Sequence, residues 1–142
     1  MIARSLRDRN SSSQKDLIRL DREESVLVRS NDLCRLATKS SSGWPHCVPV
    51  SYVHLKGRFF VPANRASRKV RNIERNPKAT LLIDEGESKE HGIMIECNST
   101  ILYGSSASKM REYMRKVKHW QNDARTVVIR LDPLRRASWF KD

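Results

Sequence analysis

The sequence has few aromatic residues, and it lacks any hydrophobic segment long enough to cross a membrane. Phe, Trp and Tyr make up 6% of its 142 residues. A membrane-spanning helix needs about 20 consecutive apolar residues, and no such run occurs. The apolar core of a secretory signal peptide is missing as well. We therefore expect a cytoplasmic protein with no membrane segment.

Cysteine is also scarce, and its spacing matches no metal-ligand pattern. The three residues Cys34, Cys47 and Cys97 are far apart and form no Cys-x-x-Cys pair. Each lies in a predicted strand, so we expect buried thiols in a reducing compartment. His46 precedes Cys47 directly, but neighbouring side chains on a strand point to opposite faces. His46 and Cys47 are therefore not expected to form a catalytic Cys-His pair.

No set of residues matches a known acid-base or nucleophilic motif. The chain has no Ser-His-Asp order, no His-Glu-x-x-His, no Walker loop and no Gly-x-Gly-x-x-Gly. Its histidines are scattered over the sequence: His46, His54, His91 and His119. We assign no catalytic residue and no metal site. If the protein is an enzyme, we expect a bound cofactor to supply the chemistry while the protein binds and orients it.

Positive charge is in excess, with 28 Lys and Arg against 16 Asp and Glu and a formal net charge of +12. Such an excess favours anionic partners, among them phosphorylated cofactors and nucleic acid. A basic surface that only faces solvent is the alternative. Nucleic acid is the less favoured partner, because the few aromatic residues do not alternate with the basic ones as stacking platforms do.

The order of predicted elements indicates one domain that is mainly β, with β and α elements combined. Residues 1–16, rich in Arg and Ser, are predicted to be a disordered basic tail, and residues 17–142 to be folded. Short antiparallel strands joined by turns predict a six-stranded β-barrel with two or three added helices. Helices are expected after Asp21, from Ser67 and over Ser105–Gln121. Strands are expected over residues 33–39, 45–55, 59–61, 79–83, 92–104 and 124–131, the fifth bent near Asn98-Ser99.

Two prolines are expected to end strands. Pro62 ends the strand at residues 59–61, which leaves residues 63–66 as a loop, and Asp132-Pro133 ends the last strand. Residues 134–142, with Trp139 and Phe140, then form a tail.

The stretch from Lys56 to Asp84 carries the clearest sign of function. Ser67-Arg68-Lys69 begins a helix that Asn76-Pro77 stops. Its apolar residues lie at helical spacing: Ala66, Val70 and Ile73. A helix start with a hydroxyl and two cations predicts an anion site, because free N–H groups and the helix dipole point at the ligand. A solvated basic face with an ordinary serine cap is the alternative.

Residues 64–77, with the strands on either side, resemble the flavin-phosphate segment of the FMN-binding split-barrel family, the pyridoxamine 5'-phosphate oxidase-like proteins. The segment Gly43–Val50 is similar to that family too, and the likeness extends from about Leu33 to Asp132. The resemblance implies a split barrel that binds FMN at the interface of a homodimer. It also implies a small-molecule substrate.

The resemblance assigns cofactor contacts to three segments. Ser67, Arg68 and Lys69 would bind the FMN phosphate, and Ala63 and Asn64 would lie near the phosphate and the ribityl chain. Backbone contacts to the edge of the isoalloxazine ring would come from four residues of one strand: Val48, Pro49, Val50 and Ser51.

The chain departs from the vitamin B6 oxidases of the family at several positions, and it has Ser99 where they have a flavin-contacting glutamine. Where those oxidases have an arginine and, five residues later, a lysine, this chain has Val48 and Val53. Oxidation of vitamin B6 is therefore disfavoured. The resemblance favours an FMN-dependent oxidoreductase, with a reductase that uses a deazaflavin coenzyme as the close alternative. A non-catalytic flavin- or haem-binding module is the alternative from another class.

Overall fold

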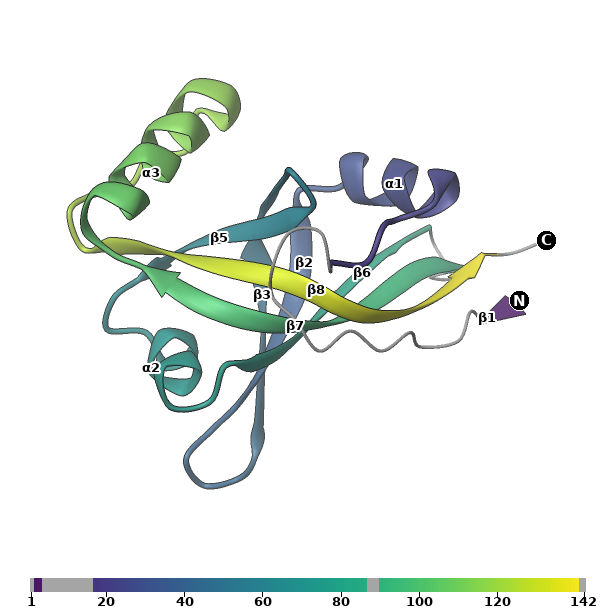
Figure 1. The fold of residues 1–142 in the computed structure, drawn as a ribbon, viewed down its shortest axis with the longest axis horizontal. Helices are drawn as coiled ribbons and strands as arrows, with labels where there is room; N and C mark the ends of the chain where they lie inside the picture. The colour runs from purple at the N-terminus through teal and green to yellow at the C-terminus, as the bar shows by residue number, and fades with distance from the viewer. Residues whose placement is uncertain (1, 4–16, 87–89, 141–142) are drawn as a thin grey trace.

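The computed structural model describes residues 2–3, 17–86 and 90–140, and it shows a curled antiparallel sheet with helices around it (Figure 1). The described residues form three helices: α1 (Arg22–Arg29), α2 (Arg68–Arg75) and α3 (Gly104–Lys118). They also form eight strands: β1 (Ile2–Ala3), β2 (Leu33–Lys39), β3 (Pro45–Ser51), β4 (Val53–Leu55), β5 (Arg58–Asn64), β6 (Lys78–Glu85), β7 (His91–Leu102) and β8 (Thr126–Phe140).

The strands lie in the order β3-β2-β6-β7-β8-β5-β4, and β1 pairs with β8. The mainly β fold with added helices is confirmed, although the described residues hold more strands than the six expected. One reason is Tyr52, which divides the predicted strand 45–55 into β3 and β4. Apart from Ile2–Ala3, the predicted tail at residues 1–16 lies outside the described residues.

The prediction that Pro62 ends a strand is wrong, because β5 continues to Asn64. β4 pairs with β5 only as far as Phe60. Beyond that point no described strand pairs with this edge of β5, so a proline without an N–H is tolerated there. Ala63 and Asn64, expected in a loop, pair with β8 at Val127 and Thr126.

The predicted C-terminal tail is also wrong, because β8 runs through Pro133 to Phe140. The last residue of β8 that pairs with β5 is Leu131, so no described strand pairs with this edge at Pro133, whose carbonyl instead accepts from the Ile18 N–H at 3.2 Å. On the β7 side, Cys97 pairs with Pro133 and Glu96 with Arg135. Leu134 is thus the extra residue of a β-bulge, which bends the strand pair. The bend expected near Asn98-Ser99 is found slightly earlier, between Glu96 and Cys97.

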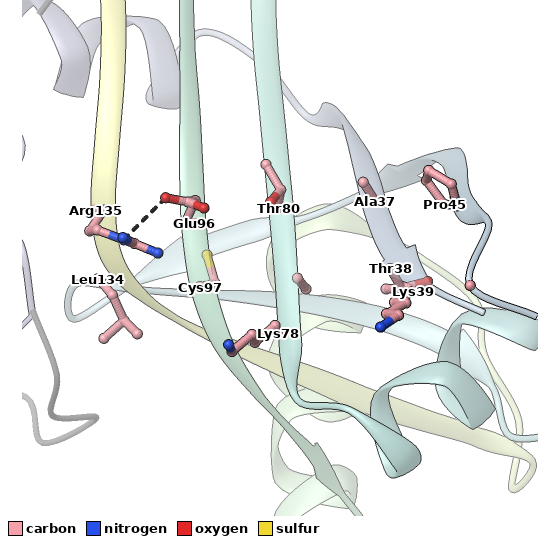
Figure 2. Close-up of a pocket in the computed structure, with 12 residues that line it drawn as sticks. Ala37, Thr38, Lys39, Pro45, Lys78, Thr80, Glu96, Cys97, Leu134 and Arg135 are labelled. Atoms are coloured by element: carbon pink, nitrogen blue, oxygen red, sulfur yellow. Dashed lines mark ion pairs between the residues drawn. The ribbon is translucent and has the colours of Figure 1, made fainter. Parts of the chain in front are cut away.

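The outer face of the sheet carries both polar and apolar side chains, and those of paired residues on neighbouring strands lie side by side. Ala37, Thr80, Glu96 and Arg135 lie in one row across β2, β6, β7 and β8 (Figure 2). Arg135 Nε lies 3.1 Å from Glu96 Oε1, an ion pair within this row. Because side chains alternate along each strand, the residues between these positions point to the inner face.

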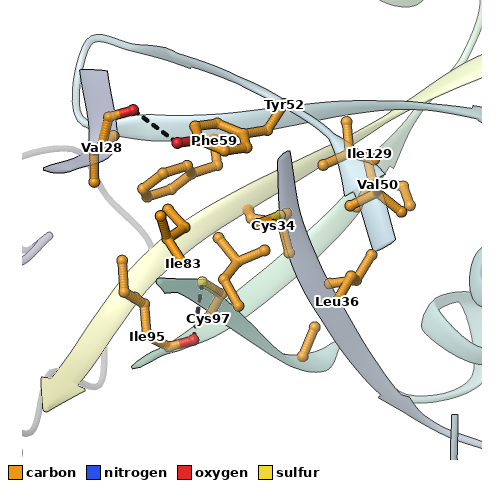
Figure 3. Packing of buried hydrophobic residues seen from close by; sticks show 14 of the residues in the cluster. Val28, Cys34, Leu36, Val50, Tyr52, Phe59, Ile83, Ile95, Cys97 and Ile129 are labelled. Carbon is orange, nitrogen blue, oxygen red and sulfur yellow. Dashed lines mark hydrogen bonds between the residues drawn. The ribbon is translucent and has the colours of Figure 1, made fainter. Parts of the chain in front are cut away.

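The inner face forms the hydrophobic core (Figure 3). Alternating residues of several strands meet there, and the fully buried ones include Leu36, Phe59, Leu81, Ile93, Ile95, Ile129 and Leu131. Tyr52 is buried too, and its hydroxyl donates a hydrogen bond to the carbonyl of Val28 at 2.7 Å. A second, smaller cluster joins α3 to the outer side of β5 and β8 through Ala107, Met114, Phe60 and Val128.

Helix α1 begins directly after Asp21, as predicted, and a capping box closes its start. The Asp21 carboxylate accepts from the Glu24 N–H, and the Glu24 carboxylate accepts from the Asp21 N–H, each at 2.9 Å. Glu24 is fully buried, and its other oxygen accepts from Arg136 Nε at 3.0 Å. This ion pair fixes α1 to β8. No described helix combines the length and the apolar composition that a membrane crossing requires.

Two of the three cysteines are buried as predicted, and one is not. Cys34 and Cys97 lie in the core, whereas Cys47 is exposed. The prediction for Cys47 is wrong because β3 is an edge strand and Cys47 points away from the core, between His46 and Val48.

Gly92→Ala should destabilise the protein, because Gly92 lies beneath the indole ring of its β8 partner Trp139. A Cβ at this position would overlap the ring. We expect a loss of about 1–3 kcal/mol in the free energy of unfolding, measured by urea denaturation. In a Trp139→Ala background the same change should cost much less. Equal losses in the two backgrounds would show that the ring is not the cause.

Only Cys47 should react quickly with a thiol reagent in the folded protein. Burial raises the pKa of the Cys34 thiol to about 12 and raises the pKa of Cys97 well above its usual value, so both lack accessible thiolate. Thiol titration should therefore show one fast group, which Cys47→Ser removes, and two more in denaturant. A fast group that remains in Cys47→Ser would contradict the buried positions.

Candidate functional site

A tight turn between β5 and α2 positions the predicted phosphate-binding residues. The Asn64 side chain accepts a hydrogen bond from the Ala66 N–H at 2.8 Å, and the Asn64 carbonyl accepts one from the Ser67 N–H at 3.0 Å. This Asx-type turn reverses the chain directly into the helix. Val70 and Ile73 then bury their side chains in the core, with 0% and 4% exposed. Ala66, expected beside them, is exposed.

The start of α2 offers unused hydrogen-bond donors. Ser67 is the N-cap, but its hydroxyl makes no capping bond, and its buried Oγ has no partner among the described residues. The first N–H bonded along the helix is that of Arg71, to the carbonyl of Ser67. The N–H groups of Arg68, Lys69 and Val70 therefore point out of the helix end. With no acidic residue in the first turn, this end favours an anion.

The two predicted cations at this helix end differ in burial. Arg68 is exposed, whereas Lys69 is partly buried, and burial lowers the pKa of its ammonium group. An anion beside a desolvated ammonium would stabilise its charged form. Arg65, the cation before the helix, instead lies over the ring of Tyr103, 5.5 Å from its centre. Tyr103 donates a hydrogen bond to Glu74, the one acid of α2.

The predicted ring-contacting residues lie on β3, the edge strand of the sheet. Val48 and Val50 face the core, while Pro49 is exposed. β2 pairs with one edge of β3, and no described strand pairs with the other. β3 approaches β5 without pairing, and Val48, Val50, Ala63 and Val70 pack in the same cluster. The strand β3 and the start of α2 therefore pack against the same hydrophobic core, in which Ala63 is buried.

A polar cavity of about 580 Å³ continues from Arg68 along α2. Sequence reasoning named Arg68 as a binding residue and missed most of the other lining residues. The lining residues come from α2 and from the hairpin between β2 and β3: Ser40, Ser41, Ser42, Trp44, Pro45, His46, Arg68, Arg71, Asn72 and Arg75. A smaller cavity of about 330 Å³ lies on the outer face of the sheet, beside Glu96 and Arg135 (Figure 2).

Asn72 connects this cavity to the sheet. It is buried, with 1% exposed. Its side-chain amide donates to Thr38 Oγ1 at 3.0 Å, and its carbonyl oxygen accepts from Arg75 Nη2 at 2.8 Å. His46 pairs with Thr38 across the strands, and its buried Nδ1 has no hydrogen-bond partner in the described part of the chain. No local pattern marks Asn72, because its partner Thr38 is distant in sequence and neighbouring residues of a helix point about 100° apart.

The described residues provide no cluster of three or more His, Cys, Asp or Glu side chains suited to a metal ion. The arrangement holds hydroxyl, amide and cationic donors at one end of α2, next to an open strand edge. This end of α2 can therefore bind an anionic group.

Comparison with known proteins identifies the family. The family model for pyridoxamine 5'-phosphate oxidase matches residues 20–140. The chain belongs to the pyridoxamine 5'-phosphate oxidase family. No match is found among the curated proteins.

Solved structures of the family confirm the split-barrel fold. General stress protein 26 from Bacillus anthracis is 23% identical, with a TM-score of 0.63, over 77% of this chain and 84% of its own. The haem storage protein HutZ from Vibrio cholerae is 19% identical, with a TM-score of 0.65, over 82% and 91%. An F420 reductase is 14% identical, with a TM-score of 0.69, over 82% and 98%. These likenesses establish the fold of the chain and not its ligand.

Thr38 and Asn72 should be energetically coupled. Asn72→Ala leaves the buried Thr38 hydroxyl without its partner, so we expect a loss of about 1–3 kcal/mol in the free energy of unfolding. Thr38→Val should cost less in an Asn72→Ala background than in the wild type, because the bond is already gone. Denaturant unfolding of the four proteins in this cycle measures the coupling. Strictly additive losses would contradict it.

Proposed function

We propose that the protein binds FMN, with the phosphate at the start of α2 and the ring along the free edge of β3. The observation that carries the proposal is the buried Ser67 hydroxyl, which has no partner in the described chain. A buried hydroxyl without a hydrogen bond is costly, and a phosphate oxygen beside it would accept one. The N–H groups of the first turn, Arg68 and Lys69 would supply the remaining donors.

A bound flavin would supply hydride or electron transfer, and the residues of the chain would bind and orient it. The proposed activity is therefore that of an FMN-dependent oxidoreductase that acts on a small molecule. The edge of β3 exposes backbone N–H and carbonyl groups that suit the rim of a flat ring. The cations that the family's vitamin B6 oxidases use are replaced here by Val48 and Val53, so we do not propose vitamin B6 as substrate.

A deazaflavin coenzyme is the alternative ligand, since it presents a phosphate to the same helix end. A non-catalytic module that holds flavin or haem is the alternative from another class. Reduction of the bound flavin by a nicotinamide donor, followed by reoxidation, would separate an oxidoreductase from a module. The predicted homodimer, with the cofactor at its interface, belongs to this proposal as well.

Ser67, Arg68 and Lys69 should bind the phosphate and not the ring. FMN and riboflavin differ only in that phosphate, so their affinities separate the two contributions. Each charge-assisted bond contributes about 1.5–3 kcal/mol, so Arg68→Ala with Lys69→Ala, which removes two of them, should weaken FMN binding by about 100- to 10,000-fold. Riboflavin affinity should change little. Fluorescence titration measures both.

Two controls complete this experiment. Lys109→Ala with Lys116→Ala removes two exposed cations from α3 and should leave FMN affinity unchanged. Ser67→Ala should weaken FMN binding without lowering the free energy of unfolding, because the hydroxyl caps nothing and its burial without a partner is costly. Equal effects on FMN and riboflavin, or none on either, would refute the phosphate assignment.

A further inference from the structure

The cavity along α2 is larger than one phosphate requires. Arg68, Arg71 and Arg75 occupy positions i, i+3 and i+7, so they share one side of the helix. At a rise of 1.5 Å per residue, this row of cations extends about 10 Å along the helix axis. The cavity beside it has a volume of about 580 Å³, which lies in the range of small-molecule sites. A single phosphate at the helix start would contact only its first arginine.

The arginines of this row are available to a ligand. None of the three has an acidic partner within the described residues. Arg75 donates only to the buried Asn72, which holds it against the cavity wall. No Asp or Glu lines the cavity, and Glu74 is engaged by Tyr103 away from it. Three arginines with nothing to neutralise them favour a group with several negative charges.

The opposite wall adds an aromatic surface. Trp44 lies in the hairpin between β2 and β3, and it is 77% exposed although it lines the cavity. Ser40, Ser41 and Ser42 line the same wall, and the Ser40 hydroxyl holds the hairpin through hydrogen bonds with the Trp44 carbonyl and Ser42 Oγ. An indole face stacks well on a nucleobase. The cavity therefore combines the features that recognise a phosphate chain with those that recognise a base.

We propose that this cavity binds a nucleoside diphosphate group, with the diphosphate on Arg71 and Arg75 and the base on Trp44. The site extends the proposed function, because Arg68 lies between it and the FMN phosphate. A nicotinamide dinucleotide carries this group and would be the electron donor for the flavin. FAD does not fit this arrangement, because one of its two phosphates is the FMN phosphate that Ser67, Arg68 and Lys69 would hold.

Calorimetric titration with ADP tests the proposal. The wild-type protein should bind ADP, and Arg71→Gln with Arg75→Gln should weaken that binding at least tenfold while FMN affinity changes less than threefold. Arg71→Gln alone, which removes no contact within the described chain, should show part of this loss without affecting folding. Trp44→Ala should weaken the binding of ADP and not that of pyrophosphate. Lys109→Gln with Lys116→Gln is the charge-matched control.

The outcomes separate this proposal from the flavin proposal. Absence of ADP binding to the wild type, or an equal loss in the α3 control, would overturn the nucleotide site. Retained ADP binding without FMN binding would support the nucleotide site and overturn the FMN assignment. Binding of NADH or NADPH to the FMN-saturated protein, lost in Arg71→Gln with Arg75→Gln, would support the electron donor.

Discussion

The burial of Val70 and Ile73 in the core is the constraint on which the rest of the site depends. These two residues attach α2 to the inner face of the curled sheet. With a helical repeat of 3.6 residues, fixing this side also fixes where Arg68, Arg71 and Arg75 point. The start of the helix is fixed as well, so its N–H groups and the Ser67 hydroxyl meet the cavity in one place. Apolar packing thereby positions a set of polar groups that do not pair with one another.

Much of this arrangement was predictable from local sequence. The apolar spacing in the basic helix and the Asn76-Pro77 stop predicted α2 nearly to the residue, because both signals act within a few positions. The capping box of Asp21 and Glu24 was readable for the same reason. The mainly β fold followed from the sequence of short strands and turns. The family resemblance then pointed to Ser67. Its hydroxyl has no partner among the described residues, which agrees with a ligand site, and binding measurements are needed to test that role.

The errors share a physical cause, since they concern contacts between segments far apart in sequence. Pro62 and Pro133 are strand breakers by local rules, yet both lie where a neighbouring strand has ended. Cys47 was expected in the core, although Pro49 on the same strand is a local sign of the edge position that β3 has. The cavity was missed because Trp44 and the arginines of α2 come together only when the hairpin between β2 and β3 folds against the helix.

The measurement that tests the account most directly is the amide NMR spectrum of the protein during titration with FMN and, separately, with riboflavin. The free N–H groups of Arg68, Lys69 and Val70 should show the largest chemical-shift changes with FMN, because they would donate to its phosphate. With riboflavin the same amides should barely move, while those of β3 still respond. If FMN leaves the α2 amides unchanged and shifts residues on α3 or elsewhere on the surface, the start of α2 is not the phosphate site.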